Sequence, residues 1–184
     1  GELRGVTSRA NIDQLTLLSA AADSLTLRNL AGNLQLLQGA ESGSFELKLS
    51  DMSVTAGELQ WAPFNANLVL KAEESIDFKA DSIDLALLNR VVLNSGALSE
   101  SAVTQLAAYN PQGRLINVSM HWPLSPEPGD NGSVQANLVN VDLGSLNGSP
   151  SLFGLNGYVE FQYDDNARVA TGFGEVESDQ FRIN

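Results

Sequence analysis

Polar and apolar residues alternate along most of this chain. The cleanest runs cover residues 24–28, 44–50 and 75–79. Alternation with a period of two places every second side chain on the same face of an extended chain, as in a half-buried strand. These runs therefore predict strands that have one apolar and one polar face.

Looser alternation recurs between these runs and through the second half of the chain. Segments rich in Gly, Asn, Asp and Ser separate the runs, and strands spaced by about 8–12 residues are typical of an antiparallel all-β architecture. The polar segment 126–132 predicts an exposed loop, and residues 164–166 predict a tight turn. The looser runs are residues 14–18, 33–37, 52–54, 59–61, 67–71, 114–122, 133–143, 159–163, 168–173 and 181–183.

Two short helices are predicted near the middle of the chain. The first follows Asp84, a plausible N-cap, and ends at residues 94–96. The second begins near Ser99 and ends at Asn110, because the residue before Pro111 avoids the α region. The inward side chains expected from helical spacing are Leu85, Leu88 and Val92 on the first helix and Val103, Leu106 and Ala107 on the second.

These elements predict one mainly β domain over residues 1–184. We expect a curved antiparallel sheet, shaped like a groove or a taco, with the helix pair at about 84–110 between two β-rich stretches. A chain of this length can bury one sizeable core. The sequence starts without a leader and stops within an alternating run, so we expect a segment of a longer protein.

Composition excludes several classes of function. The chain has 22 Asp and Glu against 10 Lys and Arg, a net charge of −12, which disfavours binding to nucleic acid or to an anionic bilayer surface. It has no Cys, so disulfides and thiolate metal sites are excluded. No apolar stretch approaches the roughly 20 residues of a membrane-spanning helix.

Candidate catalytic residues are few. His121 is the only histidine, and if Met120 and Trp122 face inward it faces outward, as a surface or hydrogen-bonded side chain. The pairs Glu73-Glu74 and Asp164-Asp165 are expected to be solvated rather than to act in acid–base catalysis. We therefore predict neither an enzyme nor a metal or cofactor site.

Three further motifs carry no functional prediction. Asn-x-Ser sequons at Asn117, Asn131 and Asn147 are expected by chance in a chain rich in Asn and Ser. Residues 154–157, Gly-Leu-Asn-Gly, lack the lysine of a phosphate loop and are predicted to form a turn. The large aromatic residues, including Trp61, Trp122 and Phe161, are expected first of all to be ordinary core.

The helix pair and the sequence after it resemble the YhdP family of AsmA-like envelope proteins. The resemblance rests on a Leu-rich helix pair that leads through a Pro-x-Gly turn into a strand ending in Trp, and on a later "P…GLxG" stretch. It covers about half of the chain, from Asp84 to Tyr163. The matching residues are 84–88, 106–115, Trp122 and 150–157.

This resemblance implies a location and a function. It implies a periplasmic segment of a Gram-negative bridge protein, anchored to the inner membrane by parts outside this chain. It also implies a long apolar β-groove that shields or transports phospholipid between the inner and outer membranes. The expected partners are phospholipid acyl chains, the anchor and the remaining segments of that protein.

The alternating runs supply candidates for the lining of such a groove. About ten strands with two or three large apolar side chains each would form an apolar face larger than soluble proteins usually expose. A second sheet, the helices or a ligand must cover it, so a closed β-sandwich serving as a spacer or interaction module is the alternative. An enzyme or a lectin-like binder is a more distant one. The candidates are Leu25, Leu27, Phe45, Leu47, Leu49, Leu68, Leu70, Ile76, Phe78, Val134 and Leu138.

Overall fold

The structure is a computed structural model. It describes residues 5–17, 25–39, 43–56, 59–94, 98–125, 130–145, 149–164, 169–178 and 180–182. The elements are β1 (Gly5–Leu17), β2 (Leu25–Gln38), β3 (Phe45–Ala56), β4 (Leu59–Lys71), β5 (Ser75–Asp84), α1 (Leu85–Asn94), α2 (Glu100–Tyr109), β6 (Gln112–Pro123), β7 (Asn131–Leu143), β8 (Ser151–Asp164), β9 (Val169–Glu177) and β10 (Gln180–Arg182).

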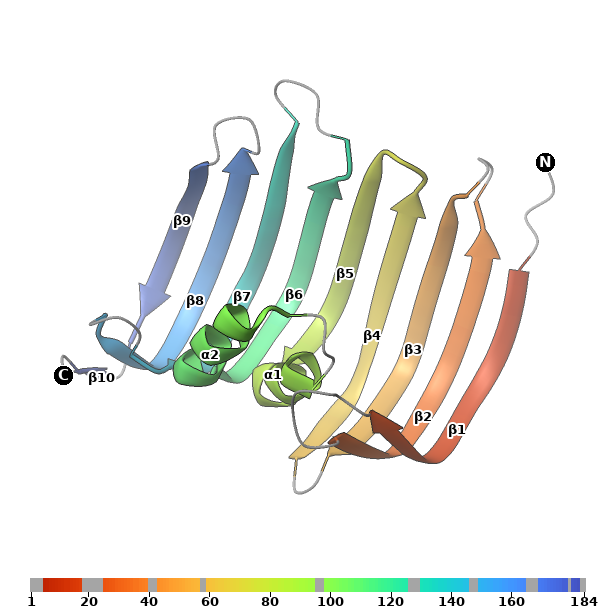
Figure 1. Cartoon of the computed structure of the whole chain (residues 1–184), viewed down its shortest axis with the longest axis horizontal. Coiled ribbons are helices and arrows are strands. Elements are labelled where there is room, and N and C mark those ends of the chain that lie inside the picture. Colours follow the sequence, from red (N-terminus) through yellow and green to blue (C-terminus); the bar gives the residue numbers. More distant parts are fainter. Residues whose placement is uncertain are drawn as a thin grey trace.

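All these strands belong to one antiparallel sheet, in which each strand from β1 to β8 pairs with the next along the chain (Figure 1). β9 and β10 both pair with β8, β9 with residues 156–164 and β10 with residues 151–153. They therefore act as one interrupted outer strand. The predicted fold class, a mainly β protein with a curved antiparallel sheet and two short helices, is confirmed.

Left-handed residues interrupt the strands away from their ends. Asp51 in β3, Asn117 in β6 and Asn140 in β7 have φ of +53°, +55° and +49°. The register of pairing shifts at each of these positions. Such a bulge bends a strand and increases its twist, and Asn and Asp tolerate the left-handed conformation better than other residues that carry a side chain.

Side chains of neighbouring strands bond to the backbone at these bulges. Asn65 Oδ1 accepts a hydrogen bond from Asp51 N at 3.0 Å, and Asp81 Oδ1 accepts one from Asn65 N at 2.9 Å. Asn156 Oδ1 similarly accepts from Asn140 N at 3.0 Å. A bulge leaves backbone groups without a partner in the strand ladder. These side-chain contacts satisfy such groups and so stabilise the bends. We call this set of residues the crease: Asp51, Asn65, Asp81, Asn117, Asn140 and Asn156.

The crease divides the sheet into two arms. The first arm runs from the crease to the strand ends at residues 38, 71, 123 and 164, and we call it the bare arm. The second runs to the strand ends nearest the helices, and we call it the covered arm. In Figure 1 the helices lie at the lower ends of the strands, and the lower parts of β1 to β4 turn away from their upper parts.

The crease also explains a difference from the sequence-based expectation. β2 has 14 residues and contains residues 25–28 of the first run and all of the run 33–37, whereas β3 has 12 and contains residues 45–50 and 52–54. Each pair of runs forms one bent strand, because a left-handed residue shifts the phase of alternation without ending the pairing. The expected spacing of strands is therefore too short.

The predicted turn at residues 154–157 is wrong for the same reason. These residues lie inside β8, where Gly154 and Gly157 have φ of +62° and +143°. A Cβ on Gly157 would collide with the carbonyl oxygen of Glu175 in β9. The glycines therefore serve a bend and a close approach of two strands, not a hairpin. Part of each of the predicted loops at 126–132 and 164–166 lies outside the described residues.

Both predicted helices are confirmed, with their caps. Asp84 Oδ1 accepts from Leu87 N at 2.9 Å at the start of α1. Ser99 Oγ accepts from Ala102 N at 3.3 Å at the start of α2, and Asn110 ends that helix in the left-handed conformation. The prediction that Ala107 faces inward is wrong, because Ala107 is exposed.

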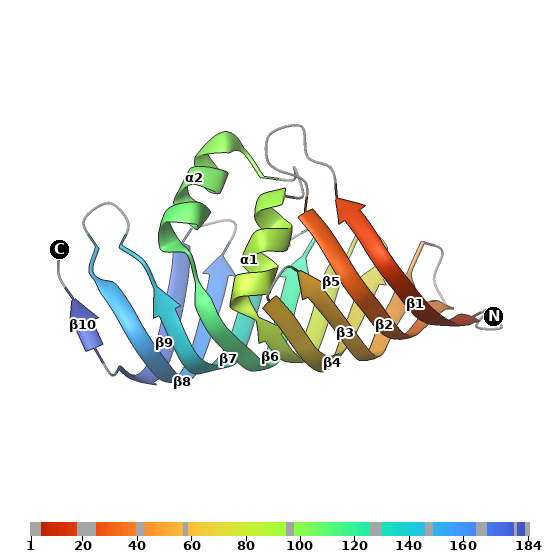
Figure 2. The same ribbon diagram turned by 90° about the horizontal axis from the view of Figure 1, so that it is seen from below.

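The helices lie on the concave side of the sheet, which forms a trough (Figure 2). Leu87 of α1 is 0% exposed and packs with Leu27 and Val54 of the covered arm. Leu88, on the next position, packs against a second cluster that includes Ala80 and Val118 beside the crease. Thus α1 covers the covered arm through Leu87, which helical spacing did not predict to face inward, and contacts the crease through the half-buried Leu88, which it did. The other predicted inward residues of α1, Leu85 and Val92, are half-buried.

The left-handed position of Asn117 generates a stability prediction. A β-branched residue in this conformation is strained by about 1–2 kcal/mol, whereas glycine adopts it freely. Because the Asn117 side chain is exposed, packing adds little. We expect Asn117→Val to lower the free energy of unfolding by about 1–2 kcal/mol relative to Asn117→Gly in chemical denaturation. Equal stabilities would mean that residue 117 does not need a left-handed backbone.

Candidate functional site

The candidate site is the concave face of the bare arm. Phe45 faces Leu70, and Leu70 faces Ile76, in consecutive strand pairs. Residues directly opposite each other in an antiparallel pair lie on one face, so these side chains form a row across the sheet. A second row, one pleat nearer the crease, runs through Leu47, Leu68, Phe78, Met120, Val134 and Phe161.

The structure brings most of the predicted groove residues together on this face. Leu27 is the exception among those described, because it is buried under α1 in the covered arm. The side chain of Leu25 lies outside the described residues. The residues on the shared face are Phe45, Leu47, Leu49, Leu68, Leu70, Ile76, Phe78, Val134 and Leu138.

Large apolar side chains on this face are open to solvent. Leu36 is 42% exposed, Phe45 37%, Trp122 40% and Phe161 52%. Among the described residues no second sheet lies over them, since every described strand belongs to the one sheet. The bare arm is therefore an uncovered apolar surface, which soluble proteins seldom present without a use.

The predicted lining residues did not include every residue of this face. Met120, Trp122 and Phe161 continue the two rows into β6 and β8, and Leu36 continues the second row into β2. Val159 lies on the same face, one pleat nearer the crease. The signal was present as alternation within 114–122 and 159–163. The expectation that the aromatics are ordinary core is confirmed for Trp61, which belongs to the core around α1, and is wrong for Trp122 and Phe161.

Two aromatic rings of the bare arm lie over glycines. A Cβ on Gly132 of β7 would come within 2.8 Å of the Trp122 ring, and one on Gly172 of β9 within 2.8 Å of the Phe161 ring. Trp122 also stacks on Tyr163, with centroids 5.6 Å apart and planes at 9°. The Trp122 and Phe161 rings therefore pack directly against the backbone of β7 and β9, in the space that a side chain at Gly132 or Gly172 would fill.

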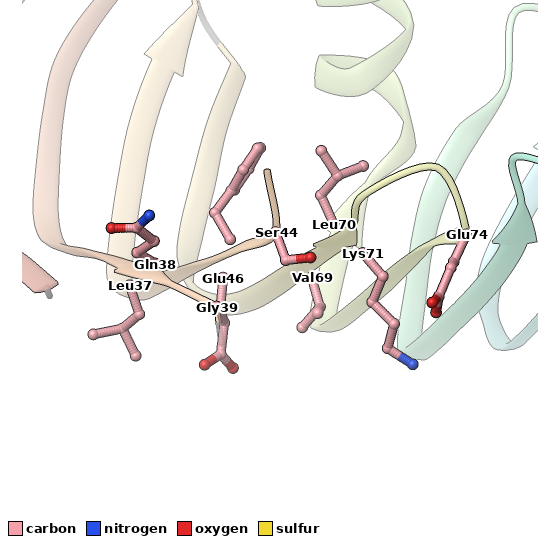
Figure 3. Close-up of a pocket in the computed structure, with 10 residues that line it drawn as sticks. Leu37, Gln38, Gly39, Ser44, Glu46, Val69, Leu70, Lys71 and Glu74 are labelled. Atoms are coloured by element: carbon pink, nitrogen blue, oxygen red, sulfur yellow. The ribbon is translucent and has the colours of Figure 1, made fainter. Parts of the chain in front are cut away.

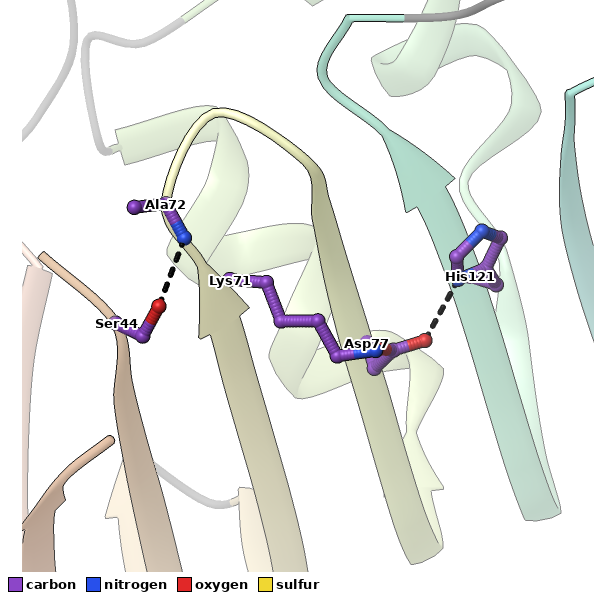
Figure 4. A network of polar contacts seen from close by, with 5 residues as sticks. All are labelled: Ser44, Lys71, Ala72, Asp77 and His121. Carbon is purple, nitrogen blue, oxygen red and sulfur yellow. Dashed lines mark hydrogen bonds and ion pairs between the residues drawn. The ribbon is translucent and has the colours of Figure 1, made fainter. Parts of the chain in front are cut away.

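The opposite, convex face carries the charges. His121 Nδ1 lies 2.7 Å from Asp77 Oδ1, and Lys71 Nζ lies 3.7 Å from Asp77 Oδ2 (Figure 4). The predicted outward, hydrogen-bonded histidine is confirmed. The Glu160 carboxylate accepts a hydrogen bond from the Tyr158 hydroxyl at 2.9 Å and raises the pKa of Tyr158. These charged side chains thus lie on the convex face, which also carries apolar residues such as Phe173, 67% exposed and paired with Glu160.

A shallow cavity of about 500 Å³ marks the rim of the bare arm at the ends of β2, β3 and β4. Figure 3 shows Leu37, Val69 and Lys71 on one side of the ribbon and Gln38 and Leu70 on the other. Glu74 also lines it, and Glu73 and Glu74 are exposed in the turn before β5, as predicted. The rim therefore joins the apolar face to polar groups of both charges.

The described part of the chain holds neither a cluster of metal ligands nor a membrane-spanning helix. No cluster of three or more His, Cys, Asp or Glu there is placed to hold a metal ion. Neither described helix is long and apolar enough to span a bilayer. Comparison of the chain with known protein families, curated proteins and solved structures gives no match.

The bare arm predicts different responses to a charge at two leucines. Leu47 is half-buried on the open face, so a glutamate there can reach water, whereas Leu87 is 0% exposed under the covered arm. An unpaired buried charge costs several kcal/mol of a typical stability of about 5–15 kcal/mol. We expect Leu47→Glu to unfold cooperatively with a modest loss in thermal denaturation, and Leu87→Glu to be unfolded. Unfolding of both variants would contradict an open face.

The polar network on the convex face predicts a small effect. The His121 and Asp77 side chains are 46% and 31% exposed, and exposed ion pairs contribute about 0–1 kcal/mol. We expect His121→Ala to change the free energy of unfolding by less than about 1 kcal/mol. A larger loss in chemical denaturation would mean that this contact supports the fold.

Proposed function

We propose that the bare arm binds the acyl chains of phospholipid and shields them from water. The observation that carries the proposal is the open concave row of Leu47, Phe78 and Phe161, set on a sheet whose charges lie on the other face. Acyl chains need contact with apolar surface and no charged partner, and this surface offers that contact.

The energy of transfer favours such a role. Burying an acyl chain gains about 0.8 kcal/mol per CH₂, so a chain of about 16 carbons exposed to water loses roughly 12 kcal/mol. A continuous apolar surface that crosses many strands offsets most of this cost. It does so without catalysis, and we propose a binding role rather than an enzymatic one.

The cellular setting follows from the resemblance to the YhdP family and is part of the same proposal. The chain would be a periplasmic segment of a longer bridge protein, held at the inner membrane by an anchor elsewhere in that protein. Its groove would shelter phospholipid on the way between the inner and outer membranes.

The alternative, a spacer or interaction module, requires a protein cover for the same face. Because the described strands form a single sheet, a closed sandwich would need its second sheet from another chain or segment. The two functions therefore differ in what contacts Leu47: lipid in the first and protein in the second.

A photo-crosslinking residue distinguishes these functions. We expect one at position 47 or 78, on the open face, to capture phospholipid in cells that make the protein. One at position 46 or 79, on the convex face, should not, because neighbouring residues in a strand point to opposite faces. Mass spectrometry of the adducts identifies the captured molecule.

The matched pairs 46/47 and 78/79 control for expression and for general contact with lipid. Equal capture of phospholipid at both members of a pair would contradict a one-faced groove. Capture of protein alone at positions 47 and 78 would favour the spacer.

A further inference from the structure

We propose that phospholipid lies across the bare arm with a fixed polarity, its acyl ends toward α1 and its headgroup at the rim beside Trp122 and Tyr163. This inference rests on the proposed function and specifies the site, assigning Trp122 and Tyr163 to the boundary between headgroup and acyl chain.

The inner end of the bare arm is closed. Leu88 of α1 packs with Ala80 and Val118 at the crease, and Leu87 fills the space beyond them. A polar headgroup placed there would lose its water without gaining a charged partner, which is costly. The inner end therefore suits the apolar end of a chain.

The outer end differs in chemistry. Trp122 and Tyr163 stand at the outer ends of β6 and β8 as a parallel pair, with Trp122 40% exposed. Trp and Tyr combine an apolar ring with a polar group and favour boundaries where one end is apolar and the other is wet. Beside Trp122, the backbone N–H of Leu124 donates a hydrogen bond to the carbonyl oxygen of Glu74 at 2.8 Å, and Glu73 and Glu74 are exposed in that turn. This end of the bare arm is therefore polar and open to water.

The distance between the two ends sets how much of an acyl chain the bare arm covers. Val118 lies at the crease and Trp122 four residues further along β6, and a strand rises about 3.3 Å per residue, so the two are about 13 Å apart. Trp61 pairs with Val54 in the covered arm, just across the crease from the inner end of the bare arm, where it packs against both core clusters and stacks on Phe64 with ring centroids 4.3 Å apart. The two tryptophans of the chain thus report on opposite ends of the bare arm.

Depth-dependent fluorescence quenching tests the polarity. The 184-residue chain is loaded with phosphatidylcholine that carries a nitroxide either near the glycerol or near the end of an acyl chain, and native mass spectrometry establishes that lipid is bound. Trp61→Phe leaves Trp122 as the reporter, and Trp122→Phe leaves Trp61.

We expect Trp122 to lose a larger fraction of its emission to the label near the glycerol, and Trp61 to the label at the chain end. Equal losses for both labels, or the reverse order, would overturn the fixed polarity while leaving the proposed function intact. Failure to retain lipid would overturn the proposed function and the polarity together. If Trp61→Phe does not fold, the difference between the wild type and Trp122→Phe supplies the signal of Trp122.

Discussion

The left-handed backbone of the crease is the constraint on which the rest of this structure depends. An antiparallel sheet of long, regular strands would twist but would not fold along a line across them. Asp51, Asn117 and Asn140 place a bend inside their strands, and side chains such as Asn65 and Asn156 bond the backbone groups beside those bends. Each of these three left-handed residues lies in a different strand. Because of these bends, apolar side chains on both sides of the crease face the same concave space.

The two arms of the trough then take different roles. The covered arm packs against α1 and supplies the core, with Leu87 at its centre. The bare arm has a similar apolar face without a protein partner in the described structure. The connection between β5 and β6 consists of α1 and α2, and α1 packs on only one of the two arms. The proposed binding surface is the arm that α1 leaves open.

Much of the fold is predictable from the sequence, and the reasons are local. Alternation predicts both that a segment is a strand and which of its side chains share a face, so residues such as Leu47 and Phe78 are placed correctly. Asp84 and Ser99 predict where the helices begin, because capping depends on residues that are adjacent in the sequence. The crease is not predictable in this way. A left-handed Asp51 shifts alternation by one residue, so that β3 looks in sequence like two separate runs, 44–50 and 52–54. Asn117 and Asn140 leave no visible break in the runs 114–122 and 133–143. Exposure is equally hidden, since Trp122 and Trp61 differ only in what the distant helix covers.

Because the bend is encoded within individual strands, the length of the trough and its cross-section are set independently. Each strand from β3 to β8 contributes a slice with its own crease residue and a part in both arms, joined to its neighbours by ordinary ladder hydrogen bonds. Duplicating or deleting a hairpin would therefore lengthen or shorten the trough while keeping its width. A chain built this way can vary in reach by changing the number of slices, whereas a barrel of the same strands would change its diameter.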